Sequence, residues 1–189
     1  ALPHIAVELR NYQSQVINTF EDLKAEGRIN AWGITAASLQ EMNQAVLEAD
    51  IKPDLIQAIS NLLDAPGGMS ICDEQPQPRA VIQLAQDQGV GVMGIRAVAA
   101  GSLTDQLDRE LHPKSAELAD FVRSEGFRKI AAEEGVTSAY LAHQYALSMP
   151  GVDTLVLGVK DRTELYECLA AEKAGSLSDE LRARIDASV

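Results

Sequence analysis

Four short apolar segments alternate with helical patterns along this chain, and this alternation limits the fold more than any other feature of the sequence. Each segment has six or seven residues and is apolar almost throughout; they are residues 29–35, 55–60, 90–96 and 154–159. Strands that are apolar on both faces and separated by amphipathic helices form a parallel sheet covered by helices. We therefore expect an α/β fold made of four consecutive strand–helix units.

Several of the helical patterns carry clear end signals. Ser38 and Glu41 have the spacing of a capping box, in which the serine oxygen accepts from a free N–H and the glutamate reaches back to the cap. Ser178 precedes Asp179 and Glu180, whose charges suit the positive end of a last helix. The other expected helices cover residues 16–27, 38–49, 79–88, 115–134 with a break near Gly126, 138–148 and 162–171.

The number of units falls short of a closed barrel. A barrel of eight parallel strands needs eight strand–helix units and typically about 250 residues, whereas this chain has 189 residues and four units. The sequence has no linker, low-complexity tract or close internal repeat, so residues 1–189 are expected to form a single domain. Two long loops, residues 61–77 and 97–114, follow strand ends, and in barrels this face carries the active site.

Composition excludes several classes of partner. A net charge of −12 leaves little basic surface for nucleic acid or for an anionic membrane. No apolar run approaches the roughly 18 residues of a membrane span, and the first residues lack the pattern of a signal peptide. The two cysteines, Cys72 and Cys168, lie far apart and belong to no metal-binding motif. We expect a cytoplasmic protein with reduced thiols and no metal.

The last strand–helix unit predicts an anion site. Its turn contains Gly158, Lys160 and Arg162, just where the helix begins. The first turn of a helix has unpaired N–H groups and the positive end of the helix dipole, so it attracts phosphate. Asp161 opposes this hypothesis because its charge repels phosphate. However, Asp161 and Glu164 also have the spacing of a capping box, so Asp161 could simply cap the helix.

Four stretches in register resemble the C-terminal half of an aldo-keto reductase. They are residues 23–35, 54–63, 91–104 and 152–160, and the closing segment 177–180 is similar to the start of the family's last helix. The resemblance covers about residues 16–189. It implies strands five to eight of a TIM barrel plus the C-terminal helix. It also implies an oxidoreductase that binds NADPH in extended form and passes hydride to a carbonyl.

The resemblance suggests contacts for the nicotinamide end of the cofactor. Gln57 matches the glutamine that holds the carboxamide, where an amide can donate and accept at once; the alternative is a polar residue satisfied at a strand end. Thr35 and Ala36 stand where many members have Ser-Asn, so one contact could be lost. Arg96 resembles a subgroup variant and could contact ligand or cofactor, or pair with a carboxylate. Asn61 is given only a structural role.

The resemblance also suggests which loop surrounds the pyrophosphate. Gly101, Ser102, Leu103 and Thr104 match the segment that wraps it in the family. Their backbone N–H groups, together with the hydroxyls of Ser102 and Thr104, are expected to serve as donors.

For the adenosine end, the resemblance involves the last strand–helix unit. Lys160 is similar to the basic residue that meets the adenosine 2′-phosphate, which favours NADP as the cofactor, and Arg162 could share that role. A solvated lysine is the alternative. Glu167 matches an acidic residue near the adenine amino group, whereas Cys168 replaces the asparagine usual beside it.

The family's catalytic residues have no clear counterpart here. Its chemistry uses a tyrosine acid tuned by a lysine and an aspartate, because a tyrosine with a pKa near 10 needs a close cation to donate a proton near neutrality. The family carries these residues on its first four units, which this chain lacks. His4 is a weak catalytic candidate, as a remnant of the family's histidine. We expect His112 and His143 at the surface or in packing, and Tyr140 and Tyr145 in the core and at its rim.

Three functional alternatives therefore stay open. The first is a truncated relative of an NADPH-dependent carbonyl reductase that is inactive alone. The second is a half-barrel that self-associates, since four units expose two sheet edges, and that binds nucleotide without reducing anything. The third is an interaction module that has lost cofactor binding. The expected partners are a nicotinamide cofactor and either a second copy or a missing N-terminal half.

Overall fold

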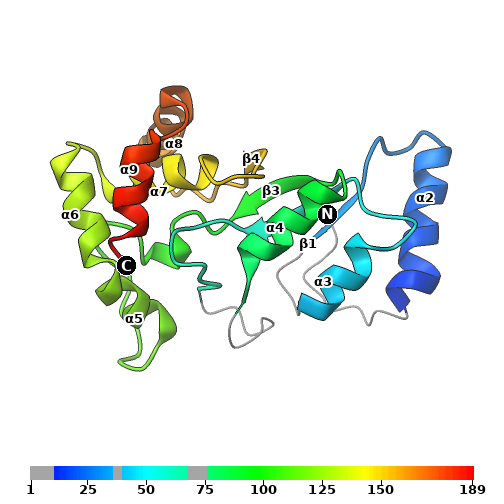
Figure 1. Ribbon diagram of the computed structural model, residues 1–189, viewed down its shortest axis with the longest axis horizontal. Coiled ribbons are helices and arrows are strands. Elements are labelled where there is room, and N and C mark those ends of the chain that lie inside the picture. The colour runs from blue at the N-terminus through cyan, green and yellow to red at the C-terminus, as the bar shows by residue number, and fades with distance from the viewer. Residues whose placement is uncertain (1–10, 36–39, 68–75) are drawn as a thin grey trace.

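A parallel sheet of four strands forms the centre of the computed structural model (Figure 1), which describes residues 11–35, 40–67 and 76–189. The strands follow chain order across the sheet, and each pairs with the next in parallel. They are β1 (Gly33–Thr35), β2 (Leu55–Ile59), β3 (Gly91–Ile95) and β4 (Thr154–Leu155). The expected α/β fold with four parallel strands is confirmed, while His4, Ser38 and Cys72 lie outside the described residues.

Helices separate the strands and continue after the last one. The elements are η1 (Tyr12–Val16), α2 (Ile17–Ala25), α3 (Gln40–Leu47), α4 (Pro78–Asp87), η2 (Ala99–Gly101), α5 (Ala116–Arg123), α6 (Glu125–Glu133), α7 (Ser138–Leu147), α8 (Arg162–Ala174) and α9 (Asp179–Asp186). In Figure 1, α5–α9 gather at one end of the molecule and α2 and α3 at the other, with the sheet and α4 between them. Among the described residues, no helix is long and apolar enough to cross a membrane.

Two expected boundaries differ from the structure. The break within the long helical segment lies at Ser124 instead of Gly126, because the Ser124 hydroxyl lies 3.0 Å from the Phe121 carbonyl oxygen in the preceding turn and competes with the helix ladder. The same hydroxyl lies 2.7 Å from the carbonyl oxygen of Ser102. Strand β4 has two residues instead of six. Its last ladder bond runs from Val156 N to the Gly94 carbonyl at 2.8 Å. Beyond this point its partner strand ends, because Arg96 adopts a left-handed φ of 64°.

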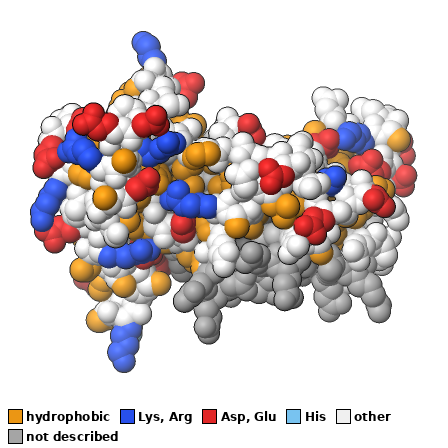
Figure 2. Space-filling model, in the orientation of Figure 1, with side chains coloured by type: hydrophobic (Ala, Val, Ile, Leu, Met, Phe, Trp, Pro, Cys, Tyr) orange, Lys and Arg blue, Asp and Glu red, His pale blue; other side chains and the backbone are white. Residues whose placement is uncertain are grey.

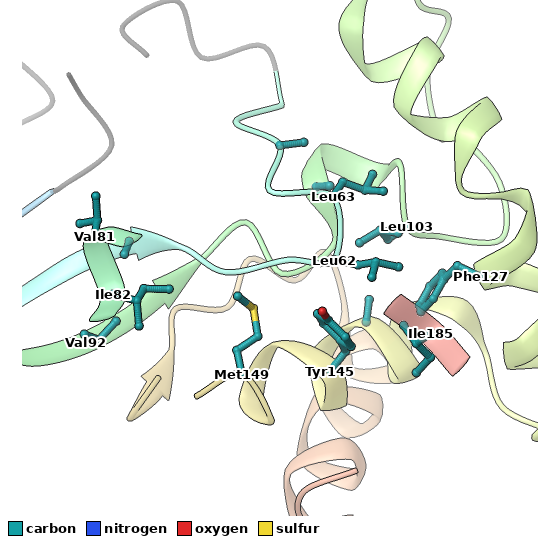
Figure 3. Packing of buried hydrophobic residues seen from close by; sticks show 14 of the residues in the cluster. Leu62, Leu63, Val81, Ile82, Val92, Leu103, Phe127, Tyr145, Met149 and Ile185 are labelled. Atoms are coloured by element: carbon teal, nitrogen blue, oxygen red, sulfur yellow. The ribbon is translucent and has the colours of Figure 1, made fainter. Parts of the chain in front are cut away.

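One face of the sheet is covered by α4 and forms the main core. Ile56 and Val92 lie side by side in the parallel register and point toward this helix, which contributes Val81 and Ile82. Figure 3 shows that the same cluster continues toward the C-terminal helices through Tyr145 and other large side chains. The alternation of side chains along β2 and β3 therefore buries one face completely.

The other face of the sheet carries a row of partly exposed side chains. Thr35, Gln57, Met93 and Thr154 are register neighbours on successive strands. The Thr35 hydroxyl donates to Gln57 Oε1 at 3.1 Å, and Gln57 Nε2 donates to the Met93 sulfur at 3.8 Å. This row is the part of the sheet that is available to a ligand or to further structure.

Candidate functional site

A cavity of about 360 Å³ lies between the loop after β3, the beginning of α7 and the turn from β4 into α8. Its wall brings together Gly101, Thr104, Gly158, Lys160 and Glu167, five of the residues expected to contact cofactor. They come from two chain segments that follow neighbouring parallel strands, whose C-terminal ends meet at one edge of the sheet. The cavity is the strongest candidate for a site.

The β3 loop that forms one wall is tightly wound. Ala99 and Ala100 adopt left-handed φ values of 47° and 57°, and Gly101 follows at 97°. Non-glycine residues take this conformation at a cost of about 1 kcal/mol or more each, so surrounding contacts must hold them. The contacts include a hydrogen bond from Ala99 N to the Arg96 carbonyl at 2.7 Å and one from Gly101 N to the Val98 carbonyl at 2.9 Å.

The donors expected to face a pyrophosphate are used within this loop. The N–H groups of Ser102, Leu103 and Thr104 donate to carbonyls of the same loop at 3.1–3.2 Å. The Ser102 hydroxyl is fully buried and donates to the Glu117 carbonyl at 2.9 Å, while the Leu103 side chain belongs to the core. The Thr104 hydroxyl lies 2.8 Å from the Gly101 carbonyl. Gly101 and Thr104 line the cavity, whereas Ser102 and Leu103 point away from it.

The beginning of α8 already has carboxylate partners. Asp161 accepts from the N–H groups of Thr163 and Glu164 at 2.8 and 3.0 Å, which confirms that it caps the helix. Glu164 Oε2 accepts from Lys160 N at 2.7 Å. In a standard capping box it would accept from the N–H of the cap residue itself, Asp161, which is one residue later. Arg162 is exposed at the first position of α8 and does not line the cavity.

Lys160 forms ion pairs across the cavity. Its Nζ contacts Asp108, which lies on the loop after β3, and lies 3.9 Å from Glu164. The hydrogen bond to Asp108 raises the pKa of Lys160, and the same bond lowers the pKa of Asp108. Arg109 also contacts Asp108, at 3.0 Å, and donates to the Ala100 carbonyl at 2.8 Å. The two walls are thus joined by charge pairs.

A histidine and a thiol face each other at the side of the cavity formed by α7 and α8. Both His143 and Cys168 are buried and line its wall. His143 Nδ1 donates to the Ala139 carbonyl at 2.7 Å, and its Nε2 lies 3.5 Å from the Cys168 sulfur. Burial raises the pKa of the Cys168 thiol. Nearby, Glu167 accepts from the Thr137 hydroxyl.

Gln57, Arg96 and Asn61 lie outside this cavity. Gln57 belongs to the row on the other sheet face. The Arg96 guanidinium donates to the Gly67 carbonyl at 3.0 Å, so its contact is a backbone oxygen instead of a carboxylate. Buried Asn61 donates to the carbonyls of Ala65 and Arg96, both at 3.0 Å, and thereby connects the loops after β2 and β3. This agrees with the structural role expected for Asn61.

Several lining residues were not predicted from the sequence, among them Asp105, Asp108 and Arg109. They lie in the long loop after β3, and nothing in their local pattern indicates which helix they reach. Asp105 accepts from Ser138 N at 3.1 Å and from its hydroxyl at 2.6 Å, so it attaches this loop to the start of α7. His143 was expected at the surface or in packing, and its buried ring forms part of the wall.

The tyrosines with altered acidity are not arranged as proton donors. Burial raises the pKa of Tyr12 to about 12, and its hydroxyl has no hydrogen-bond partner among the described residues. Burial and a hydrogen bond to Asp186 raise the pKa of Tyr145 to about 12 as well. Tyr145 is a core residue, as expected, and also accepts from Arg79 at 2.9 Å. Neither tyrosine lines the cavity.

Comparisons with known proteins extend over nearly the whole chain. The model of the aldo/keto reductase family matches residues 4–189. L-galactose dehydrogenase from Arabidopsis thaliana is 27% identical over 161 residues, which are 84% of this chain and 46% of that protein. The chain therefore spans about half the length of this curated relative.

Solved structures show the same fold at lower sequence identity. The holo form of an aldo-keto reductase from Bacillus halodurans has a TM-score of 0.71 at 21% identity, and the match covers 97% of this chain and 58% of that one. A glycerol dehydrogenase from Gluconobacter oxydans has a TM-score of 0.66 at 19% identity, covering 91% of this chain and 52% of that one.

Proposed function

The chain belongs to the aldo/keto reductase family, and from this premise we propose that it forms the nucleotide-binding part of such an oxidoreductase without a complete catalytic site. The observation that carries the proposal is the cavity, where expected cofactor residues from the β3 loop and from the β4–α8 turn meet. The composition and the free Cys168 thiol agree with a cytoplasmic setting, which belongs to the proposal as well.

We assign the two ends of a nicotinamide dinucleotide to different parts of the chain. Gln57 would hold the nicotinamide carboxamide: its Oε1 accepts from Thr35, while its Nε2 faces the Met93 sulfur, a weak acceptor that a stronger one can replace. Glu167 and the other residues of the cavity wall would hold the adenosine end. When bound, the cofactor would supply hydride chemistry.

A 2′-phosphate fits this cavity poorly, although the resemblance implies NADP. The lining residues include the carboxylates of Asp105, Asp108, Glu164 and Glu167, against the cations Lys160 and Arg109. Both cations already contact Asp108. NADP binding would therefore require a phosphate to displace Asp108 from Lys160, and we derive no step that depends on that phosphate.

We propose that the chain alone does not reduce carbonyl compounds. A tyrosine acid needs a pKa lowered by a nearby cation, whereas the pKa values of Tyr12 and Tyr145 are both raised to about 12. No tyrosine is among the lining residues of the cavity in the described part of the chain. His4 remains an untested candidate, and we assign it no step.

Two measurements on the purified chain test this function. Titration calorimetry with NAD and NADP is expected to detect nucleotide binding, and an assay with reduced cofactor and an aromatic aldehyde is expected to detect no turnover. Gly158→Leu should abolish binding, because a Cβ at this position meets no atom within 4 Å and the leucine side chain would fill space in the cavity that the nucleotide needs. Ala174→Leu, at the exposed end of α8, is the matched control. Steady cofactor oxidation by the chain would show that a catalytic acid is present.

A second candidate function is a half-barrel, a single domain completed by a second copy or by the missing half. It is favoured by six of the nine large hydrophobic residues that are exposed in the described part of the chain, because these six lie close together in sequence. We name them the apolar patch: Val156, Leu157, Val159, Leu165, Tyr166 and Leu169. Helix α8 buries Cys168 and Ala171 on its other side. A helix that is apolar on both sides is normally covered on both.

Sedimentation equilibrium distinguishes this candidate. A mass of two chains or more that falls when the apolar patch is made polar would support self-association. A wild-type monomer at all concentrations would leave a separate N-terminal half as the remaining means of completing the barrel.

A further inference from the structure

Lys160 already has carboxylate partners in the structure. Its ammonium contacts the Asp108 carboxylate and lies 3.9 Å from Glu164 Oε1, and its backbone N–H donates to Glu164 Oε2 at 2.7 Å. Two carboxylates therefore surround Lys160, the cation whose resemblance to the family suggested contact with a 2′-phosphate. A phosphate entering here would lie beside both of them.

The nearby helix start offers no compensation. The N–H groups of Thr163 and Glu164 both donate to Asp161 Oδ1, at 2.8 and 3.0 Å. A capping carboxylate uses the donors and the dipole end that would otherwise attract an anion. Arg162, the other cation of this turn, does not line the cavity. The Lys160 ammonium and these N–H groups thus already have carboxylate partners, where a 2′-phosphate would need free donors.

We propose that this cavity takes a dinucleotide with an unphosphorylated adenosine ribose, NAD or NADH, in preference to NADP or NADPH, and that Asp108 and Glu164 determine this preference. The inference rests on the proposed function, because it concerns the adenosine end of the same site. Ionised carboxylates only accept hydrogen bonds, and the ribose hydroxyls donate them. A carboxylate on the ribose hydroxyl is the usual arrangement for NAD, and it repels a 2′-phosphate.

The structure also shows how NADP could bind at least as well as NAD. Asp108 lies on a loop and its ion pair with Lys160 is exposed, so a phosphate could replace Asp108 and take Lys160 as its partner. In that case Asp108 would act as a weak competitor and NADP would still bind at least as well as NAD. The two outcomes differ in the ratio of the two dissociation constants.

The experiment is titration calorimetry of the full chain with NAD and with NADP at one fixed ionic strength. We expect NAD to bind more tightly, and we expect Asp108→Asn and Glu164→Gln each to move the ratio about fivefold toward NADP, the upper range for an exposed charge pair. Glu172→Gln is the control: it removes the same charge from an exposed position of α8 that does not line the cavity. Thermal melting of each variant verifies folding.

The results separate this inference from the function on which it rests. Equal or tighter binding of NADP by the wild-type chain would overturn the preference while leaving the nucleotide site intact. An unchanged ratio in both carboxylate variants would overturn the role of Asp108 and Glu164. Absence of binding by either dinucleotide would overturn the proposed nucleotide site and the preference together.

Discussion

The β1 and β4 ends of the sheet differ in how completely their apolar side chains are covered by neighbouring helices. At the β1 end, Trp32 is 3% exposed and stacks on Phe20 with ring centroids 5.5 Å apart. The Trp32 indole N–H donates to Glu21 at 2.6 Å, and its backbone N–H donates to Asp54 at 3.0 Å. Lys24 of α2 forms an ion pair with Asp54 at 2.6 Å. These contacts hold helix α2 against the segments that precede β1 and β2.

At the β4 end, several large apolar side chains are exposed. Its strand has two paired residues, and the apolar patch follows directly. On the face shown in Figure 2, acidic and basic side chains are interspersed, and hydrophobic side chains gather where the C-terminal helices meet the sheet. The apolar segments 29–35 and 154–159 are similar in length, but the first includes the buried Trp32 whereas the second includes the exposed Val156, Leu157 and Val159. Large apolar side chains are therefore covered at the β1 end and exposed at the β4 end.

The largest expected effect contrasts an aromatic residue from each end. Trp32→Ala should lower the free energy of unfolding by about 3–5 kcal/mol, because it empties a packed aromatic cluster. Tyr166→Ala, at a residue that is 66% exposed on α8, should change it little. Urea denaturation at low protein concentration measures both. Similar losses of unfolding free energy in the two variants would contradict the proposed difference between the two ends.

The next effect concerns association through the β4 end. Leu165→Ser combined with Leu169→Ser should weaken a symmetric dimer about 1000-fold, since burying a half-exposed leucine contributes about 1 kcal/mol and the two copies together lose four leucines. Sedimentation equilibrium over a range of concentrations measures the change. Ile51→Ser, at an exposed hydrophobic residue away from the apolar patch, should leave the association constant unaltered. An equal loss in this control would show that the effect is not local to the β4 end.

A smaller effect concerns the ion pair of Asp54 at the β1 end. Burial raises the pKa of Asp54, but the hydrogen bonds from Lys24 and from Trp32 N outweigh burial, so the pKa of Asp54 lies below its ordinary value. The carboxylate therefore stabilises the fold above its unfolded pKa, about 4, and this contribution disappears as the pH falls through the lower folded value.

The corresponding variant is Asp54→Asn, which should cost about 1 kcal/mol at neutral pH, a figure reduced for the partial exposure of the pair. The difference from the wild type should shrink as the pH falls below about 4. Denaturation curves at several pH values measure it. A difference that stays constant down to strongly acid pH would show that the charge of Asp54 is not responsible.

The smallest expected effect returns to the cavity beside the β4 end. Lys160→Ala removes the partner of Asp108 and Glu164, so it should weaken NADP about two- to fivefold more than NAD. Calorimetry at low and high salt measures the difference, and high salt should diminish it. Equal weakening of the two dinucleotides would mean that Lys160 does not influence the region of the 2′-phosphate.

Local signals in the sequence predicted several elements correctly. The apolar run of β2 and the helix of α4 lie within one residue of their expected positions. Ser178 caps α9 by accepting from Leu181 N at 3.2 Å, and Asp161 caps α8. Such features depend on side chains within about four residues of the groups they bind, so the local sequence contains the necessary information.

Other features depend on residues far apart in the chain. The pairing of Lys160 with Asp108 crosses 52 positions, as the difference between their numbers shows, and neither local pattern indicates it. The early end of β4 follows from the point where β3 turns away at Arg96. The use of the N–H groups of residues 102–104 within their own loop follows from the left-handed turn before them.

The sequence by itself determined the order of strands and helices, the parallel sheet and the family, because apolar periodicity and cap residues act over short distances. Only the tertiary structure decided which charges surround Lys160, which loop donors are already bonded and which end of the sheet is left uncovered. These properties arise where separate loops and helices meet, and the energy of a charge or an apolar side chain depends on the neighbours found there.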